Sequence, residues 1–372
     1  MENTVIIMSE IYKIVLTGGP CAGKTTALDF IKNELESRGV EVFVLNEIAT
    51  YLMNNGLHPH EMGSYQFHSL LFKTQLDEEK RLETLAQTCG KEKAVILCDR
   101  GLLDNKVYVS DEDFKKYSAS NGMNENKILC SYNAVFHLVT AANGAEEFYT
   151  LENNNARSEN PEKARQLDED IISVWAGTPH LRVIDNSTGF ELKLKRLLSE
   201  VLAVVGIPQP LEIERKFLIV YPDLNFLNNM KLCRKIPISQ TYLKTPDEGN
   251  FRIRKRGEGE QAVYIKTVKR KISDIKRIEI ENYISEKEYN DYLMMKEFVN
   301  GTISKDRYCF VDNSTYYELD VFPFWNNTAL LEIELLSEDQ EYSLPEFVNV
   351  IREVTFEKQF RNKTLAVMYG EK

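Results

Sequence analysis

Residues 211–216 read Leu-Glu-Ile-Glu-Arg-Lys, and this run decides how the second half of the chain is interpreted. On a β-strand alternate side chains share a face, so Glu212, Glu214 and Lys216 are expected to point the same way. Neighbouring carboxylates repel each other and are costly to remove from water. They become favourable where a divalent cation lies between them and an anion meets the lysine. The run therefore predicts a strand that binds metal and anion.

Charged pairs at the same spacing recur along the rest of the chain, and apolar residues such as Ile253 and Ile333 lie between them. For any single pair, the solvated face of a sheet is the simpler interpretation. Because both signs of charge recur on many predicted strands, we favour one shared inward face. A closed barrel of about eight strands has room inside for side chains or one small ligand. The acidic pairs besides those at 212 and 214 are Glu279 and Glu281, Glu318 and Asp320, and Glu332 and Glu334.

This inward face predicts a site for a triphosphate-containing small molecule. Basic side chains bind polyphosphate through charge-assisted contacts, and the candidates are Lys216, Arg252, Arg254, Lys266, Lys305 and Arg307. Carboxylates suit Mg²⁺ or Mn²⁺, which would polarise the phosphoryl group and position a water molecule. The candidate metal ligands are Glu212, Glu214, Glu332 and Glu334, of which the last two are also candidate catalytic residues.

Bulk properties narrow the class of protein. A chain of 372 residues is long for one domain and favours two. The net charge of −11 argues against general nucleic-acid binding, which depends on neutralising phosphates. Scattered cysteines without zinc-ligand spacing favour a reduced, cytoplasmic setting. No run of about 20 apolar residues predicts a membrane span.

The first half alternates between strand and helix patterns, which predicts a parallel sheet covered on both faces. The expected strands are 14–17, 42–46, 94–98, 135–140 and 181–184. Residues 206–210, Gly-Ile-Pro-Gln-Pro, predict a linker between domains at 1–205 and 211–372. After it, short alternating segments predict an antiparallel sheet or barrel, with helices near 285–297 and 345–355.

A phosphate-binding loop lies between the first expected strand and a helix. The sequence from Gly18 to Thr26 reads Gly-Gly-Pro-Cys-Ala-Gly-Lys-Thr-Thr. Glycines let backbone amides surround phosphate oxygens, and the helix N-terminus adds positive charge. Lys24 is expected to reach the β- and γ-phosphates of ATP or GTP, and Thr25 to ligate Mg²⁺. The nucleotide-binding candidates are Gly18, Gly19, Pro20, Cys21, Ala22, Gly23, Lys24, Thr25 and Thr26.

Three further residues near this loop are candidates for metal binding and catalysis. Asp99 ends a strand, where it either holds the magnesium shell through water or simply caps a helix. Arg100 follows it, and the Asp-Arg pair resembles the nucleoside and nucleotide kinase branch of P-loop proteins. In that resemblance Glu47 accepts a proton from the phosphoryl acceptor; the alternative is a solvated surface carboxylate.

Arg157 and Arg165 lie in and after a polar loop, where arginines can close over phosphates and stabilise transferred charge. Surface ion pairs are the alternative for both. Asn186 follows the last expected strand of the first half, where a purine is usually held. The residues do not decide between adenine and guanine.

Several of these motifs resemble known families. The run from Gly18 to Thr26 resembles the loop of ribosylnicotinamide kinase-like domains. The Glu-x-Glu-x-Lys run at 212–216 and the charged set resemble the CYTH fold, the triphosphate tunnel metalloenzyme superfamily, over roughly 209–370. The two together resemble the family named for a translocation defect of the TRPL photoreceptor channel. Residues that carry this likeness are Ala141-Ala-Asn-Gly-Ala-Glu146, Phe148-Tyr149, Trp175 and Asp185-Asn186.

These resemblances imply two main functions. The first is a metal-dependent enzyme whose tunnel hydrolyses inorganic or nucleoside triphosphate and whose P-loop domain binds ATP or GTP and phosphorylates a small acceptor. The second is a regulatory protein, peripheral at membranes, that binds GTP and phosphoinositide or phosphatidic acid. For the second, basic residues from Lys266 to Arg277 could contact anionic headgroups, or simply be an exposed strand end. Adenylyl cyclase activity is a third interpretation.

Overall fold

The protein is described from a computed structural model, which covers residues 9–149, 160–207, 213–243, 250–271, 277–294, 299–335 and 339–370. At 148, 250, 269–271, 277–280 and 299–300 the backbone alone is described. The chain divides into two compact units, Met1–Val201 and Leu202–Lys372. Within the described residues, every helix is too short or too polar to cross a lipid bilayer.

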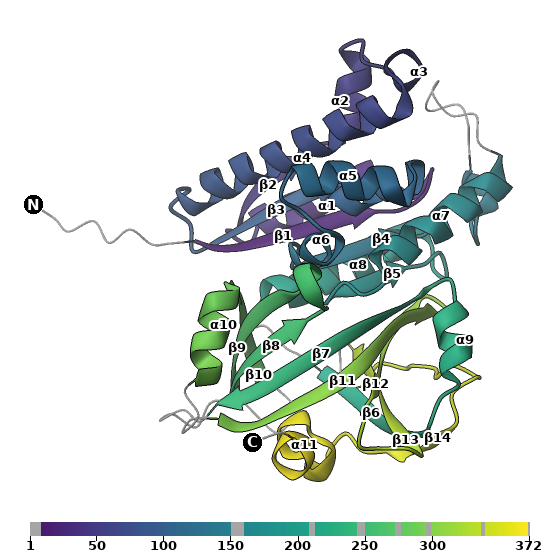
Figure 1. Ribbon diagram of the computed structural model, residues 1–372. Helices are drawn as coiled ribbons and strands as arrows, with labels where there is room; N and C mark the ends of the chain where they lie inside the picture. The colour runs from purple at the N-terminus through teal and green to yellow at the C-terminus, as the bar shows by residue number, and fades with distance from the viewer. Residues whose placement is uncertain are drawn as a thin grey trace, which may run out of the picture. The chain divides into compact units, whose positions relative to one another are not determined.

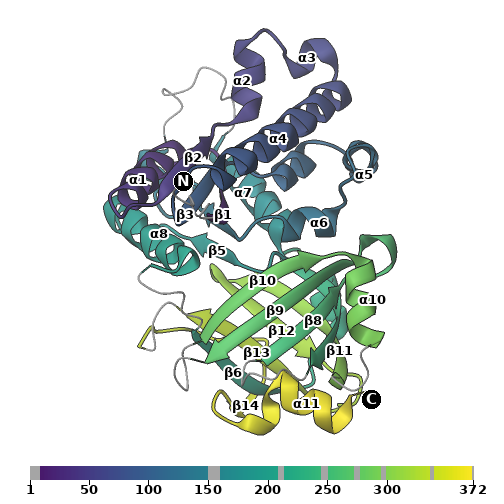
Figure 2. The same ribbon diagram turned by 90° about the vertical axis from the view of Figure 1, so that its left-hand side faces the viewer.

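The first unit is a parallel five-stranded sheet in the order β2-β3-β1-β4-β5 (Figure 1). Its strands are β1 (Glu10–Thr17), β2 (Glu41–Leu45), β3 (Lys93–Asp99), β4 (Ala134–Leu138) and β5 (Leu181–Ile184). The central strands are buried because helices cover both faces (Figure 2), as the continuous apolar runs predicted. The α/β prediction for this half is confirmed.

The helices of the first unit connect these strands. They are α1 (Lys24–Glu36), α2 (Ile48–Asn54), α3 (Pro59–Met62), α4 (Ser64–Gln87), α5 (Asp111–Ser120), α6 (Glu125–Cys130), α7 (Pro161–Trp175) and α8 (Phe190–Val205), with 3₁₀ turns η1 (Leu102–Tyr108) and η2 (Glu146–Phe148). The helix α1 buries Ala27, Leu28, Ile31 and Leu35, which lie on one face at helical spacing. This packing fixes the helix N-terminus directly after the glycine-rich loop.

The second unit is a curled antiparallel sheet in the order β10-β9-β8-β7-β11-β12-β13-β6-β14 (Figure 2). Its strands are β6 (Ile213–Val220), β7 (Cys233–Leu243), β8 (Asn250–Arg256), β9 (Val263–Lys271), β10 (Arg277–Ile284), β11 (Val299–Asp312), β12 (Thr315–Val321), β13 (Thr328–Leu335) and β14 (Val350–Glu353). The predicted antiparallel, barrel-like fold is confirmed. The sheet has nine strands rather than about eight, and β10 and β14 are its edges in the described chain.

The helices of the second unit are α9 (Leu224–Asn229), α10 (Glu286–Met294) and α11 (Asn362–Tyr369), with 3₁₀ turns η3 (Gly259–Gln261) and η5 (Lys358–Phe360). The helix predicted near 345–355 is wrong. Val350 pairs with Ile219 at the sheet edge, so strand pairing there overrides the helical pattern. Pro237 lies within β7, one residue beyond the last β7–β8 pair, where its missing N–H costs little.

The two faces of the curled sheet differ in chemistry. The outer face of β6, β11, β12 and β13 is apolar and packs with α9; its buried cluster includes Phe217, Phe310, Tyr317, Leu319 and Leu331. A second apolar cluster contains Tyr242, Ile303, Phe322 and Leu330 together with Leu365 and Ala366 of α11. Ile303, Phe322 and Leu330 alternate in step with Lys305, Asp320 and Glu332, so the inner face carries this second apolar cluster as well as the charged residues.

Candidate functional site

The glycine-rich loop of the first unit wraps around the amine of Lys24. Gly18, Cys21 and Gly23 have φ values of 142°, 55° and 84°. Lys24 Nζ donates to the carbonyl oxygens of Gly18 at 3.1 Å and Gly19 at 3.3 Å. A Cβ on Gly18 would lie 2.1 Å from the carbonyl oxygen of Leu138, so this position requires glycine. The loop has the backbone shape that a phosphate-binding loop needs.

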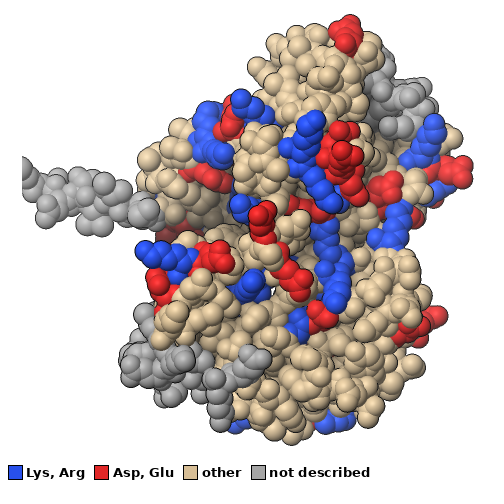
Figure 3. Space-filling view, in the orientation of Figure 1, with Lys and Arg blue, Asp and Glu red and all other residues tan. Residues whose placement is uncertain are grey.

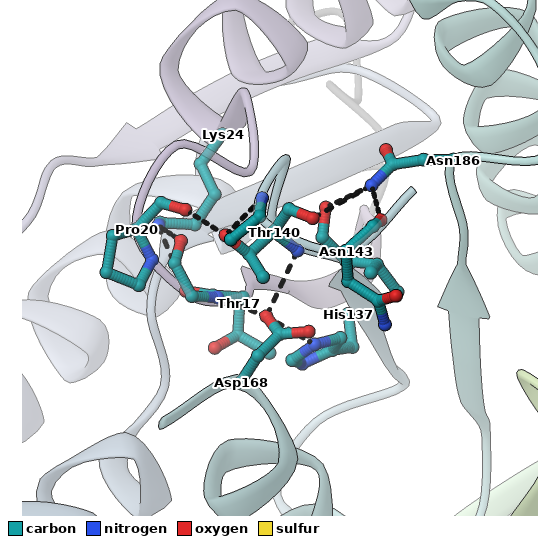
Figure 4. A network of polar contacts seen from close by, with 12 residues as sticks. Thr17, Pro20, Lys24, His137, Thr140, Asn143, Asp168 and Asn186 are labelled. Atoms are coloured by element: carbon teal, nitrogen blue, oxygen red, sulfur yellow. Dashed lines mark hydrogen bonds and ion pairs between the residues drawn. The ribbon is translucent and has the colours of Figure 1, made fainter. Parts of the chain in front are cut away.

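Asp168 of α7 anchors this loop from the side (Figure 4). Its Oδ1 accepts hydrogen bonds from the backbone amides of Gly19 at 2.7 Å and Thr140 at 3.2 Å, and lies 3.1 Å from His137 Nε2. Burial would raise the pKa of Asp168, but His137 and the two amides outweigh burial and lower it. The Gly19 amide, predicted to bind phosphate, is thus bonded to Asp168.

Asp99 lies at the end of β3, beside the loop. Its Oδ1 is buried and has no hydrogen-bond partner among the described residues, and burial raises the pKa of its carboxyl group. The turn η1 begins at Leu102 with Gly101 as its N-cap, so Asp99 does not cap that turn. An unpartnered buried carboxylate oxygen beside a phosphate loop fits a bound cation, directly or through water.

Arg100 and Glu47 form an ion pair next to Lys24. Arg100 Nε donates to Glu47 Oε1 at 2.6 Å. Burial would raise the pKa of Glu47, but the Arg100 guanidinium outweighs it and lowers that pKa to about 2. Burial, assisted by Arg100, lowers the pKa of Lys24 to about 8. While it is paired in this way, Glu47 is a weak base.

The other residues predicted to act in the first unit are Arg157, Arg165 and Asn186, and their contacts give less support to the predicted roles. Arg157 lies outside the described residues. Arg165 donates to the carbonyl oxygen of Ala142 at 2.7 Å. The Nδ2 of Asn186 donates to the carbonyl oxygens of Thr140 at 2.8 Å and Asn143 at 2.7 Å. These bonds tie Asn186 to the loop after β4, so its amide is not free to hold a purine as predicted.

The charges of the second unit lie on the inner face of the curled sheet. Their exposed fractions are small: Lys216 6%, Lys305 5%, Arg307 8%, Asp320 0% and Glu332 7%. In the view of Figure 3, the surface over β7 and β11 carries few charged side chains. The prediction of an inward charged set therefore agrees with the burial of these five residues, because the solvated-face alternative would leave them exposed.

Arg307 is the centre of a buried ion-pair network. Its Nε lies 2.7 Å from Asp320 Oδ1, and its Nη2 lies 3.0 Å from Glu332 Oε2. Lys216 Nζ lies 2.7 Å from Glu332 Oε1. Arg307 also contacts Glu318, and Lys305 contacts Asp320. Each buried charge thus has an opposite charge beside it, as burial requires.

The pKa values in this network differ by residue. Burial and the neighbouring Arg307 lower the pKa of Lys305 to about 8. Burial would raise the pKa of Glu332, but Lys216 and Arg307 hold it well below its usual range. Burial raises the pKa of Glu318 above its usual range despite Arg307. Glu318 is consequently the better proton acceptor of the two carboxylates.

Two pairs of carboxylates face each other across strands. Glu214 is opposite Glu334 on β6 and β13, and Glu318 is opposite Glu332 on β12 and β13. Like charges directly opposite destabilise a sheet unless a cation compensates them. Glu212 lies outside the described residues. Among the residues that are described, no cluster of three or more His, Cys, Asp or Glu forms a metal site.

Arginines line the strands farther along the same face. Arg252 and Arg254 of β8 lie 3.6 Å and 3.8 Å from Glu281 Oε1. Arg256, only 1% exposed, shares their face and was missed, although the spacing by two continues from Arg254. Arg234 of β7, opposite Cys309, was also missed.

One predicted member of the inward set is wrong. Lys266 pairs with Ile253, which lies between Arg252 and Arg254 on the strand and packs outward against Tyr289 of α10. Residues directly opposite each other share a face, so Lys266 lies on the outer face. The basic stretch from Lys266 to Arg277 was the candidate for contact with anionic lipid headgroups. The side chains of most of it, residues 269–277, lie outside the described residues.

Comparisons with known proteins match the two units of the chain separately. A family model described as an AAA domain matches residues 13–193, and one described as a CYTH domain matches 210–360. The inorganic triphosphatase of Nitrosomonas europaea is 32% identical over 162 residues, which cover 42% of this chain and 97% of that protein.

Solved structures are also similar to part of the chain. That of an inorganic triphosphatase is 31% identical, covers 42% of this chain and 94% of that one, and has a TM-score of 0.30. That of a putative adenylyl cyclase from Hippeastrum, described as having a dominant triphosphatase activity, is 12% identical, covers 33% and 80%, and has a TM-score of 0.25. Since the Nitrosomonas relative is matched along almost its whole length, the chain belongs to the CYTH family, with an AAA domain ahead of its CYTH domain.

Proposed function

We propose that the second unit hydrolyses a triphosphate, inorganic or nucleoside-linked, with the help of a divalent cation. The observation that carries the proposal is the buried network around Arg307, in which Lys216 and Lys305 also take part. Such a concentration of cationic donors on an enclosed face is suited to an anion with many oxygens. The similarity to an inorganic triphosphatase supports the same reaction.

In this proposal the basic residues exchange partners when substrate binds. Lys305 and Arg307 now bond to Asp320, and phosphate oxygens would replace part of those bonds. In the reaction, a water oxygen bonds to the terminal phosphorus and the P–O bond to the bridging oxygen breaks. Inorganic triphosphate then yields phosphate and pyrophosphate, and a nucleoside triphosphate yields phosphate and nucleoside diphosphate. In this proposal Glu318 accepts the proton from water, because its raised pKa makes it a stronger base than Glu332, whose pKa is lowered.

The facing carboxylates Glu214 and Glu334, together with Glu212, would hold Mg²⁺ or Mn²⁺. When bound, that cation would supply charge to polarise a phosphoryl oxygen and lower the pKa of water.

We also propose that the first unit binds ATP or GTP at its phosphate loop, with Thr25 and Asp99 as the residues that would hold Mg²⁺. The buried Oδ1 of Asp99, for which the described part of the chain offers no hydrogen-bond partner, supports this role. Phosphorylation of a small acceptor would require Arg100 to release Glu47, since the paired carboxylate is a weak base.

The test is phosphate release from inorganic triphosphate, ATP and GTP with Mg²⁺ or Mn²⁺, alongside nucleotide binding. Lys24→Ala should lose tight nucleotide binding and keep triphosphate cleavage. The double variant Glu212→Ala/Glu214→Ala should show the opposite. Absence of phosphate release from every substrate, or equal loss of all activities in both variants, would overturn the proposal.

A further inference from the structure

An exposed aromatic ring lies against the phosphate loop. Phe190, the first residue of α8, is 45% exposed. A Cβ added to Gly23, just before Lys24, would come within 2.5 Å of Phe190 Cε2. One edge of the ring therefore packs on the loop, while much of the ring is open to solvent. No role assigned above to the nucleotide site uses this ring.

The polar groups near Phe190 are already engaged with the protein. Asn186 Nδ2 is bonded to the carbonyl oxygens of Thr140 and Asn143, and its Oδ1 accepts from Lys193 Nζ at 2.7 Å. Lys193 Nζ also donates to the carbonyl oxygen of Val139 at 2.8 Å. These bonds hold both side chains against the protein.

Thr188 differs from these neighbours. Its Oγ1 is buried and has no hydrogen-bond partner among the described residues. It precedes Phe190 by two positions and follows the last strand of the sheet. A hydroxyl group both donates and accepts, so it can meet either an amino group or a carbonyl oxygen.

Resting on the proposed binding of ATP or GTP by the first unit, we propose that Phe190 is the platform on which the nucleobase stacks. Stacking uses the π face, which every base has, and therefore supplies affinity without choosing among bases. Adenine and guanine differ in their edge groups, whereas stacking on Phe190 uses the faces that they share. The Thr188 hydroxyl suits either edge and does not choose between them. The site accordingly takes adenine and guanine nucleotides with comparable affinity.

The experiment is calorimetry of the full chain with Mg²⁺ and ADP, GDP or inorganic pyrophosphate, probes that lack the triphosphate expected for the other unit. Phe190→Ala should weaken ADP and GDP by about tenfold each, and change pyrophosphate by less than about twofold. In the wild type, ADP and GDP should differ by less than about threefold. Phe190→Trp should restore base binding, and Phe190→Leu, which keeps an apolar contact with Gly23, should not.

Leu192→Ala is the matched control, because Leu192 lies on the same helix and is 54% exposed; it should leave all three affinities unchanged. Unchanged ADP binding in Phe190→Ala, an equal loss for pyrophosphate, or a more than tenfold preference between ADP and GDP would overturn the inference. If Lys24→Ala binds ADP as wild type does, the proposed nucleotide site itself fails. Dependence on Lys24 without dependence on Phe190 rejects the stacking role alone.

Discussion

The phosphate loop and the inner charged face are both suited to phosphate, but they are built from different parts of the chain. The loop uses backbone groups and glycines of one continuous segment, 18–26, whose last three residues begin α1. The inner face uses side chains from separate strands, from Lys216 on β6 to Glu332 on β13. A backbone site is therefore sensitive to the shape of the chain, while a side-chain site is sensitive to the balance of buried charge.

The largest expected effect is on stability at the inner face. Arg307→Met should lower the free energy of unfolding of the second unit by about 3–5 kcal/mol, because Asp320, which is 0% exposed, loses most of its compensation. Urea unfolding followed by circular dichroism measures this loss.

Lys235→Met is the control for Arg307. Lys235 on β7 forms a 2.7 Å ion pair with Asp306, the neighbour of Arg307 on β11, but both side chains are about 40% exposed, at 44% and 40%. Removal of such a surface pair should cost less than about 1 kcal/mol. Equal losses in the two variants would show that the Arg307 network is not buried as described.

The next largest effect tests whether the phosphate loop, unlike the inner charged face, depends on the shape of its backbone. Gly18→Ala places a Cβ 2.1 Å from a backbone oxygen, whereas Gly39→Ala, also at positive φ, meets nothing within 4 Å. Gly39→Ala should therefore show only the cost of a left-handed backbone, about 1–2 kcal/mol. Gly18→Ala should in addition abolish ADP binding measured by calorimetry. Retention of ADP binding in Gly18→Ala would contradict the described loop.

A smaller effect concerns pH, and it should be similar in both sites. The pKa values of Lys24 and Lys305 are both lowered from 10.5 to about 8, chiefly by burial, so each lysine is charged below pH 8 and neutral above it. Nucleotide affinity and triphosphate cleavage should therefore both decline as the pH rises through about 8.

Lys305→Arg should move the decline in triphosphate cleavage to higher pH and leave the nucleotide profile unchanged, because arginine stays protonated. Steady-state cleavage rates and ADP affinities between pH 6 and pH 10 provide the comparison. An identical profile for Lys305→Arg and the wild type would remove Lys305 as the titrating group.

The smallest effect tests the direction in which one lysine points. Lys266→Ala should change triphosphate cleavage by less than about twofold, because its strand position faces α10 rather than the arginines. Arg252→Ala, one pairing position away on the neighbouring strand, should reduce cleavage by tenfold or more. Equal losses of triphosphate cleavage in the two variants would show that Lys266 lies on the inner face.

Much of the fold was predictable from the residues, because the apolar runs of the parallel sheet and the alternating charges of the curled sheet are local patterns. Lys266 was misplaced because its face depends on the register with Ile253, which no local pattern gives. The strand at 350–353 was misread as helix because its pairing partner lies far away on β6. Asp168 was missed because only the packing of α7 brings it to Gly19.

We infer that the inner charged face is a phosphate-binding site that is independent of the phosphate loop. Calorimetric titration of the Lys24→Ala protein with inorganic triphosphate tests this directly. We predict one binding site for each chain, which Arg254→Ala removes in the same background. Absence of binding to the Lys24→Ala protein, or binding that Arg254→Ala leaves intact, would contradict the account.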